Sequence, residues 1–295
     1  MTTTGGHTQG TSDWAPTRDG RLLHAMALPG PDPRPTGTPT VVFEAGAAAD
    51  RSSWALVQPR TGDLTRAIVY DRAGLGRSAS DTDRSLARMA DDLNDLLDHV
   101  EPGPFVLVGH SAGGPIVRLA AAHRPDRIAG LVLVDPTDEA APTLFRPGFR
   151  RAERSVIAAS SVLARLGLLR PMFRWLLRDL PDDVRADLER EGFTPGIVRT
   201  QRRQARTFLD ELAVWRDDPP DLGEVPVTVI SGAMAGGGMT AAIRAEVNAA
   251  HAIRADRCPG GRHVIGPASG HYVPITEPHL VVAEIARLLP GRPEA

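Results

Sequence analysis

The chain has 295 residues, of which 42% are hydrophobic, and its 34 basic and 36 acidic residues give a formal net charge of −2. A chain of this size can bury a sizeable core in one large domain or two small ones. The near balance of charge gives no reason to expect a nucleic acid or an anionic membrane as partner. All 34 basic residues are arginine, which excludes a Schiff-base lysine and the lysine of a phosphate-binding loop.

The single cysteine and the N-terminal residues limit the remaining possibilities. Because Cys258 is the single cysteine of the sequence, an intrachain disulfide and a cysteine-based zinc site are excluded. We expect Cys258 to be an inert loop thiol. No apolar run approaches the ~20 residues of a membrane span. The first residues show neither the basic nor the apolar region of a signal peptide, so we expect a cytoplasmic protein. Residues 1–14 are polar and rich in Gly and Thr, which predicts a disordered tail.

Strand and helix patterns alternate along most of the chain. Short apolar runs predict buried strands, which lie at residues 40–44, 67–70, 105–108, 130–134 and 225–230. A weakly alternating pattern predicts an early strand at residues 21–28, and a last strand is expected at residues 262–265. Apolar positions spaced three and four apart predict helices, which lie at residues 86–100, 113–123, 240–252 and 277–289. The sequence therefore predicts an α/β fold: a doubly wound, mainly parallel sheet of about eight strands with helices on both faces.

The segment from residue 137 to residue 221 differs from the rest. It contains no β-branched run, and its apolar residues recur at helical spacing, so we expect an all-helical insertion between two strands. Its arginines at 146, 150, 151 and 154 offer cations for an anionic substrate. The acidic residues of the insertion nearly balance its arginines, however, which favours a solvated helix face.

The pattern that suggests chemistry is Gly109-His110-Ser111-Ala112-Gly113, between a predicted strand and a predicted helix. This is G-x-S-x-G, the nucleophile elbow, in which a tight turn exposes the serine above a sheet. A second pattern, D-R-x-G-x-G-x-S at residues 71–78, follows another apolar strand. With these two patterns the chain resembles the α/β-hydrolase family. The resemblance implies a hydrolase core over residues 15–136 and 222–292 and a helical cap over residues 137–221.

A serine nucleophile needs a base, and the base needs an acid that orients it. His271 follows Ser269-Gly270 after the last predicted strand, as the family's S-G-H pattern requires, whereas the rival His263 lies within the strand. The commonest family position for the acid is the loop after the seventh strand, but residues 231–239 contain no carboxylate. Some family members use the end of the sixth strand, where Asp135 stands. We therefore predict Asp135 as the acid, with Asp138 as the second choice.

The resemblance also implies two backbone donors for an oxyanion hole. One is the N–H of Ala112, directly after the predicted nucleophile, and the other is the N–H of Ala47, in the small-residue loop 45–49. A plain strand-to-helix turn is the alternative interpretation of that loop. Asp71 and Arg72 are interpreted as structural residues, because a carboxylate there lies on the wrong strand for the triad.

The predicted function is that of a serine hydrolase, carboxylesterase-like, acting on an ester, lactone or similar acyl bond of a small hydrophobic molecule through an acyl-enzyme on Ser111. No cofactor or metal is required. A serine at the elbow argues against haloalkane dehalogenase and epoxide hydrolase chemistry, which uses Asp there. Two alternatives stay open: a cofactor-free perhydrolase, lyase or acyltransferase with the same triad, and a non-catalytic hydrolase-like binding protein. We expect no nucleic-acid partner, no membrane span, and a monomer or homodimer.

Overall fold

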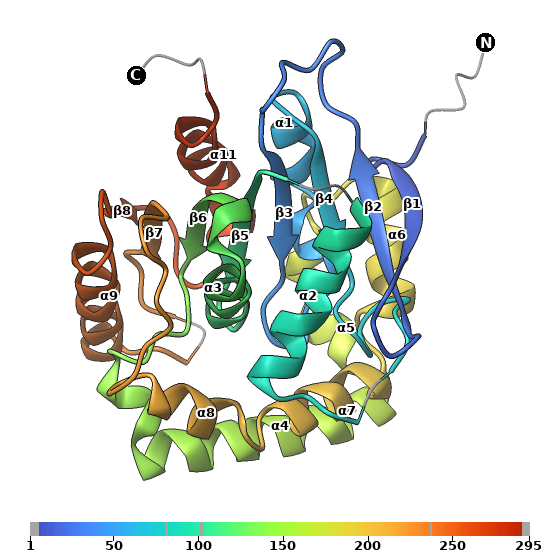
Figure 1. Ribbon diagram of the computed structural model, residues 1–295. Coiled ribbons are helices and arrows are strands. Elements are labelled where there is room, and N and C mark those ends of the chain that lie inside the picture. The colour runs from blue at the N-terminus through green and yellow to red at the C-terminus, as the bar shows by residue number, and fades with distance from the viewer. Residues whose placement is uncertain (1–5, 81, 101–102, 237, 291–295) are drawn as a thin grey trace.

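A single eight-stranded sheet forms the centre of the computed structural model, which describes residues 6–80, 82–100, 103–236 and 238–290 (Figure 1). The strand order is β1-β2-β4-β3-β5-β6-β7-β8. The strands β4, β3, β5, β6, β7 and β8 pair in parallel. At one edge of the sheet, β2 pairs antiparallel with β4, and β1 pairs antiparallel with β2. The strands are β1 (Thr11–Pro16), β2 (Leu22–Leu28), β3 (Thr40–Glu44), β4 (Ala67–Tyr70), β5 (Phe105–His110), β6 (Ile128–Val134), β7 (Val227–Gly232) and β8 (Arg262–Gly266).

The central strands are buried on both faces, which explains why they appear in the sequence as continuous apolar runs. Every residue of β3, β4, β5 and β7 is buried. Alternate side chains of each strand point to opposite faces, so the sheet separates two hydrophobic clusters. Covering both faces with helices removes this apolar surface from water and leaves the strand ends as the accessible edges.

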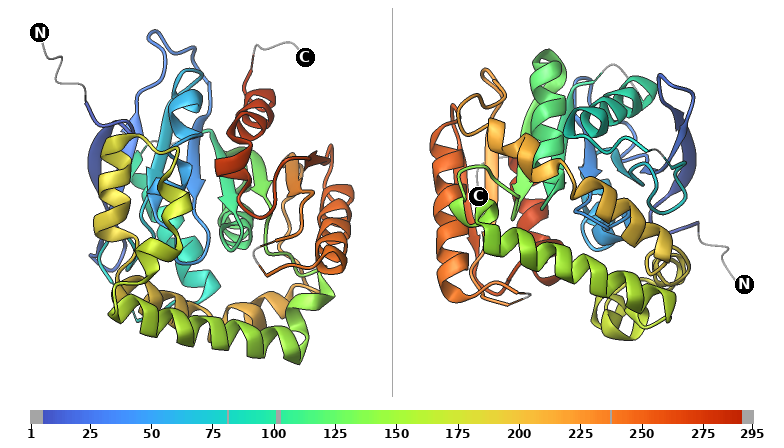
Figure 2. Two further views of the ribbon diagram at one scale, coloured as in Figure 1. Left: turned by 180° about the vertical axis from the view of Figure 1, so that it is seen from behind. Right: turned by 90° about the horizontal axis from the view of Figure 1, so that it is seen from below.

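Helices cover both faces of the sheet (Figures 1 and 2). The helices α2, α3 and α9 pack on one face, and η1, α1 and α11 pack on the other. The bounds are η1 (Arg51–Trp54), α1 (Gln58–Gly62), α2 (Leu86–Val100), α3 (Gly113–His123), η2 (Pro125–Arg127), α9 (Ala241–Asp256), α10 (Val273–Thr276) and α11 (Pro278–Arg287). Within the described part of the chain, no helix combines the length and the apolar character that a membrane crossing requires.

The segment between β6 and β7 is helical and lies across one end of the sheet, where α7 and α8 follow one another alongside α4 at the bottom of Figure 1. Its elements are η3 (Pro142–Phe145), α4 (Pro147–Arg165), α5 (Leu169–Met172), η4 (Arg174–Leu177), α6 (Asp182–Glu191), α7 (Pro195–Gln204) and α8 (Phe208–Val214). Buried ion pairs hold α6 to the core: Nη2 of Arg51 lies 2.5 Å from Asp187, and Nη1 lies 2.7 Å from Glu191.

The expectation of a disordered tail over residues 1–14 is wrong for the part that the structure describes. β1 begins at Thr11 and pairs antiparallel with β2, and Gln9 is buried. Only Ala15 of β1 is buried, because β1 is an edge strand with most of its side chains in solvent. Its sequence is therefore polar, and the ladder with β2 provides the order that composition does not indicate. Residues 1–5 lie outside the described residues.

Candidate active site

Ser111 stands on a strained turn between β5 and α3. Its φ is +54°, in the left-handed region that side chains avoid. The two glycines of the pattern permit this turn because a Cβ on either would collide with backbone. A Cβ on Gly109 would lie 2.6 Å from the carbonyl oxygen of Gly113, and one on Gly113 would lie 2.7 Å from the carbonyl oxygen of Glu44. The turn thus lifts Ser111 out of the strand at the carboxyl edge of the sheet.

Three non-glycine residues of the described chain have positive φ, and all three follow neighbouring parallel strands. They are Ala48 after β3 (+54°), Ser111 after β5 (+54°) and Asp135 after β6 (+42°). Such a conformation costs of order 1–3 kcal/mol and persists where the surrounding structure enforces it, which occurs most often at functional sites. The strain therefore marks one edge of the sheet, between β3 and β6, as the place to look for chemistry.

The structure brings His271 and Asp135 together. Asp135 directly follows β6, His271 lies in the loop after β8, and Nδ1 of the histidine is 2.6 Å from Oδ2 of the carboxylate. The other carboxylate oxygen, Oδ1, accepts from the backbone N–H of Gly232 at 3.1 Å and from Nη1 of Arg244 at 2.5 Å. Each oxygen therefore has its own partners, which fixes the plane of the carboxylate and directs Oδ2 at the imidazole.

The surroundings of Asp135 favour its ionised form. Burial alone raises the pKa of this carboxyl, but the hydrogen bond and charge of His271, together with His251 and Arg244, hold the pKa well below its usual range. Arg244 is itself buried, and its Nε and Nη2 have no hydrogen-bond partner within the described residues. Gly232, the last residue of β7, contributes a backbone N–H to the site, whereas the family commonly has a carboxylate in the loop that follows this strand.

The alternative acid and base residues are engaged elsewhere. Asp138 lies 3.0 Å from Nε of Arg254. His263 shares a hydrogen bond of 2.8 Å with the hydroxyl of Ser231. Glu246, the first carboxylate after the β7 loop, accepts from the backbone N–H of Thr143 at 2.5 Å. None of the three contacts His271 in the described structure.

His110, the variable residue of the elbow, contacts both the backbone and the ring of His271. Its Nε2 donates to the backbone carbonyl of His271 at 2.8 Å, and the two rings lie 4.8 Å apart. Burial, with a smaller effect from the neighbouring His271, lowers the pKa of His110 to about 4, so its ring is neutral near pH 7. A single histidine in a variable position carries no signal in the sequence, so the role of His110 appears only in the structure.

The loop after β3 is held by Arg72 in a way that exposes a backbone donor. Nη1 of Arg72 donates to the carbonyl of Ala45 and Nη2 to the carbonyl of Gly46, both at 2.9 Å. In a trans peptide the N–H of the next residue points away from that carbonyl. The N–H of Ala47 is therefore directed away from Arg72. It has no acceptor within the described residues, and the same is true of the N–H of Ala112.

Asp71 lies away from the site, as its interpretation as a structural residue requires. It is fully buried and accepts from the backbone N–H groups of Arg51 and Arg77, each at 3.1 Å. Its Oδ2 also accepts from Nη1 of Arg51 at 2.7 Å and lies 3.1 Å from Nδ1 of His24. A Cβ on Gly76 would lie 2.3 Å from the carboxylate, so the glycine lets the D-R-x-G-x-G-x-S loop wrap around Asp71.

A cavity of about 240 Å³ joins these groups. Ala47, Ser111, Ala112 and His271 all line it. Half of the other lining residues are large apolar side chains of the helical segment and of the region around α9, namely Leu144, Phe149, Phe208, Leu209, Met239, Ile243 and Val247. The polar side chains in the rest of the wall are those of Thr137, Thr143, Glu153, Gln201 and Gln204. No hydrogen bond joins the hydroxyl of Ser111 to His271 among the described residues. Nor do those residues contain a group of three or more His, Cys, Asp or Glu side chains arranged to hold a metal ion.

Comparison with known proteins assigns the family. The model of the alpha/beta hydrolase family matches residues 41–284, which is most of the chain. The chain belongs to the alpha/beta hydrolase family. An "AB hydrolase superfamily protein" of Gibberella zeae is 26% identical to this hydrolase over 304 aligned residues, covering 90% of each chain.

Solved structures share the fold of this alpha/beta hydrolase from end to end. The epoxide hydrolase CorEH superposes with a TM-score of 0.72 at 20% identity, covering 94% of this chain and 98% of that one. A thermophilic esterase from Thermogutta terrifontis superposes with a TM-score of 0.65 at 22% identity, covering 94% and 97%. The family assignment makes the protein a hydrolase. At such identities the neighbours show the fold alone, so the bond that is cleaved has to be argued from the site.

Proposed function

We propose that this alpha/beta hydrolase is a serine hydrolase that cleaves an ester, lactone or similar acyl bond through an acyl-enzyme on Ser111. The observation that carries the proposal is the set of groups around one cavity. It contains a serine on a strained turn, a histidine whose Nδ1 lies 2.6 Å from a buried carboxylate, and two backbone N–H groups that have no acceptor among the residues the structure describes. A serine at this position also argues against the epoxide chemistry named for one structural neighbour, which in this family uses an aspartate nucleophile.

In the proposed mechanism, Asp135 holds the proton of the neutral imidazole on Nδ1, which leaves Nε2 of His271 free as the base. Nε2 takes the hydroxyl proton while Oγ of Ser111 bonds to the acyl carbon. The N–H groups of Ala47 and Ala112 donate to the oxyanion, and one such donor is typically worth about 3 kcal/mol. The C–O bond to the leaving group breaks as that group takes the proton from Nε2. Water then attacks the acyl-enzyme by the same steps, which releases the acid and restores Ser111.

The helical segment over residues 137–221 is proposed to act as a cap that selects the substrate. Its side chains supply much of the apolar wall of the cavity opposite Ser111. An apolar wall around a few convergent polar groups suits a small hydrophobic acyl group. We therefore propose a neutral, hydrophobic substrate rather than a short, charged one.

Turnover of a panel of nitrophenyl esters with acyl chains of graded length tests the proposal. We expect kcat/KM to rise with apolar chain length until the chain fills the cavity, and we expect Ser111→Ala to abolish turnover. A folded wild-type protein that hydrolyses none of these esters and no lactone would contradict it. Preference for short, charged esters would contradict the substrate class while leaving the acyl-enzyme mechanism intact.

A further inference from the structure

The near-zero net charge of the chain conceals a strongly basic stretch. Between residues 146 and 178 there are eight arginines and one acidic residue, Glu153. The acidic residues that balance the helical segment as a whole lie mostly after this stretch, from residue 179 onward. Three of the eight arginines are neutralised by acids from elsewhere, since Arg146 pairs with Glu246, Arg150 with Asp210 and Arg170 with Glu189. The other five form no ion pair with any described residue.

Exposed apolar side chains concentrate in the same stretch. The described residues include twelve large hydrophobic side chains that are exposed, and six of them lie between residues 156 and 175. The six are Val156, Val162, Leu166, Leu168, Met172 and Trp175. Val162 and Leu166 are neighbours on successive turns at the end of α4, and Arg165 stands beside them. Seen from below in Figure 2, α4 crosses the face of the molecule nearest the viewer. We call α4, α5 and η4 the basic face.

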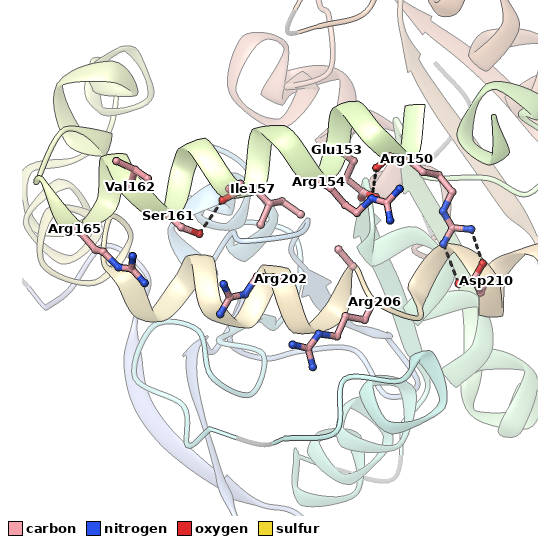
Figure 3. Close-up of a pocket in the computed structure, with 12 residues that line it drawn as sticks. Arg150, Glu153, Arg154, Ile157, Ser161, Val162, Arg165, Arg202, Arg206 and Asp210 are labelled. Carbon is pink, nitrogen blue, oxygen red and sulfur yellow. Dashed lines mark hydrogen bonds and ion pairs between the residues drawn. The ribbon is translucent and has the colours of Figure 1, made fainter. Parts of the chain in front are cut away.

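A groove along α4 adds further guanidinium groups. It has a volume of about 700 Å³ and lies between α4 and α7, where Figure 3 shows Arg154, Arg165, Arg202 and Arg206 along its length. Arg165, Arg202 and Arg206 form no ion pair within the described chain, and Nε of Arg154 donates to a backbone carbonyl. Planar guanidinium groups bind phosphate oxygens in pairs of parallel hydrogen bonds, so the groove can receive an anionic headgroup.

We propose that the basic face docks on an anionic lipid surface. Exposed apolar side chains flanked by arginines, on a helix of 19 residues, are the features of a helix that lies in the headgroup region. The aliphatic part of each arginine side chain can lie along the apolar layer while its charge stays among the phosphates. This inference goes beyond the proposed function, because it concerns where the hydrolase works and not which bond it cleaves.

Two other occupants fit the observations less well. A second copy of the chain, related by two-fold symmetry, would bring the excess arginines of one face against those of the other. A nucleic acid would use the arginines but would leave Val162 and Leu166 exposed without a partner. An anionic lipid surface uses both kinds of side chain together.

Docking through the basic face would also place the cavity that contains Ser111 close to the lipid. Trp175 of the basic face packs edge-on against Tyr272, with ring centroids 4.9 Å apart, and Tyr272 directly follows His271. Glu153 and Ala205 line both the groove and the cavity that contains Ser111. A lipid-bound protein therefore holds its catalytic cavity next to the lipid phase, where hydrophobic esters dissolve.

Co-sedimentation with vesicles tests the docking. The probes are vesicles of phosphatidylcholine alone and of phosphatidylcholine with phosphatidylglycerol as the minority lipid, both at physiological salt. Each arginine near an anionic surface contributes a factor of roughly five to partitioning. We expect at least about tenfold tighter partitioning to the anionic vesicles, falling as salt is raised. The emission of Trp175, isolated by comparison with Trp175→Phe, should shift to the blue on binding.

Two variants of this surface and one matched control separate the contributions. The charge variant carries Arg154→Gln and Arg165→Gln on α4 and Arg202→Gln and Arg206→Gln on the facing wall of the groove. We expect it to lose at least about tenfold in partitioning. The apolar variant carries Val162→Ser and Leu166→Ser and should also bind more weakly. The control carries Ile253→Ser and Arg257→Gln on and after α9, an exposed apolar and cationic pair outside the basic face, and should bind as the wild type does. Circular dichroism and thermal melting confirm that each variant folds.

Several results would overturn the docking proposal. They are equal partitioning to neutral and anionic vesicles, absence of binding to both, wild-type binding by the folded charge variant, and retention on an oligonucleotide with no binding to vesicles. A sedimentation equilibrium showing a dimer that the apolar variant abolishes, together with no vesicle binding, would assign the face to a second copy instead. None of these results depends on esterase activity, so the docking and the proposed function can fail separately.

Discussion

Replacing Asp135 with asparagine tests the orientation of His271, the proposed catalytic base. Oδ1 of Asp135 accepts from Gly232 at 3.1 Å and from Arg244 at 2.5 Å, while Oδ2 lies 2.6 Å from Nδ1 of His271. In Asp135→Asn the two donors fix the amide oxygen on their own side and turn the amide NH₂ towards Nδ1. The imidazole must then accept at Nδ1 and carry its proton on Nε2, where it cannot accept the proton of Ser111.

The magnitude follows from these contacts. Restoring the working tautomer requires the amide to flip, which gives up the hydrogen bonds from Gly232 (about 1 kcal/mol) and Arg244 (about 2 kcal/mol). Loss of the carboxylate charge beside the developing imidazolium costs roughly 3 kcal/mol more at an effective dielectric constant of about 20. The total corresponds to a loss in kcat of roughly 10⁴-fold, with little change in KM.

Steady-state kinetics on the best nitrophenyl ester measure this loss, and Glu246→Gln provides the control. Glu246 contacts Thr143 and Arg146 but not His271, so its variant should keep nearly all activity. Adding Arg244→Met to Asp135→Asn removes one of the two anchors, so the double variant should regain roughly tenfold over Asp135→Asn. The reasoning is refuted if folded Asp135→Asn keeps kcat within about tenfold of the wild type, or if the double variant gains nothing.

Two further predictions concern the groups that support the site. Arg72 pairs with Glu44 as well as with the two loop carbonyls. Arg72→Lys keeps the positive charge beside Glu44 but cannot bond both carbonyls, so kcat and the affinity for a boronate inhibitor should each fall roughly tenfold while KM changes little. Equal weakening of substrate and inhibitor would contradict this. His110 has a pKa of about 4 in the fold against about 6.5 in the unfolded chain, so the unfolded state binds more protons between these values. The free energy of unfolding should therefore fall by roughly 3 kcal/mol as the pH drops from about 6.5 to about 4, and His110→Gln should lose this part of the dependence in pH-resolved denaturant titrations.

The residues that sequence analysis identified are those whose chemistry leaves a local pattern. The elbow glycines can be recognised in the sequence because only glycine avoids the backbone collisions around Ser111. The central strands are visible because burial on both faces demands continuous apolar runs. Asp135 was predicted from the resemblance to the family, some members of which use the end of the sixth strand, and from the absence of a carboxylate in residues 231–239. The structure places it in contact with His271.

The supporting residues left no such pattern. Arg244 is one of 34 arginines, and only the docking of α9 beside β7 brings it to Asp135. The strain at Ala48 and Asp135 appears only in the backbone angles, because a positive φ cannot be predicted from an alanine or an aspartate in the sequence. The edge strand β1 is polar because it is exposed, so composition suggested disorder where pairing with β2 gives order. In each case the missing information is tertiary.

Mass spectrometry of the acyl-enzyme tests the central claim most directly. The folded protein is incubated with a fluorophosphonate or with a slowly hydrolysed nitrophenyl ester, and the modified residue is located by peptide mapping. We predict one adduct per chain, on Ser111, absent in Ser111→Ala and formed far more slowly in His271→Ala. Ester turnover by a folded wild-type protein that forms no adduct, or that forms it on a residue other than Ser111, would contradict the account.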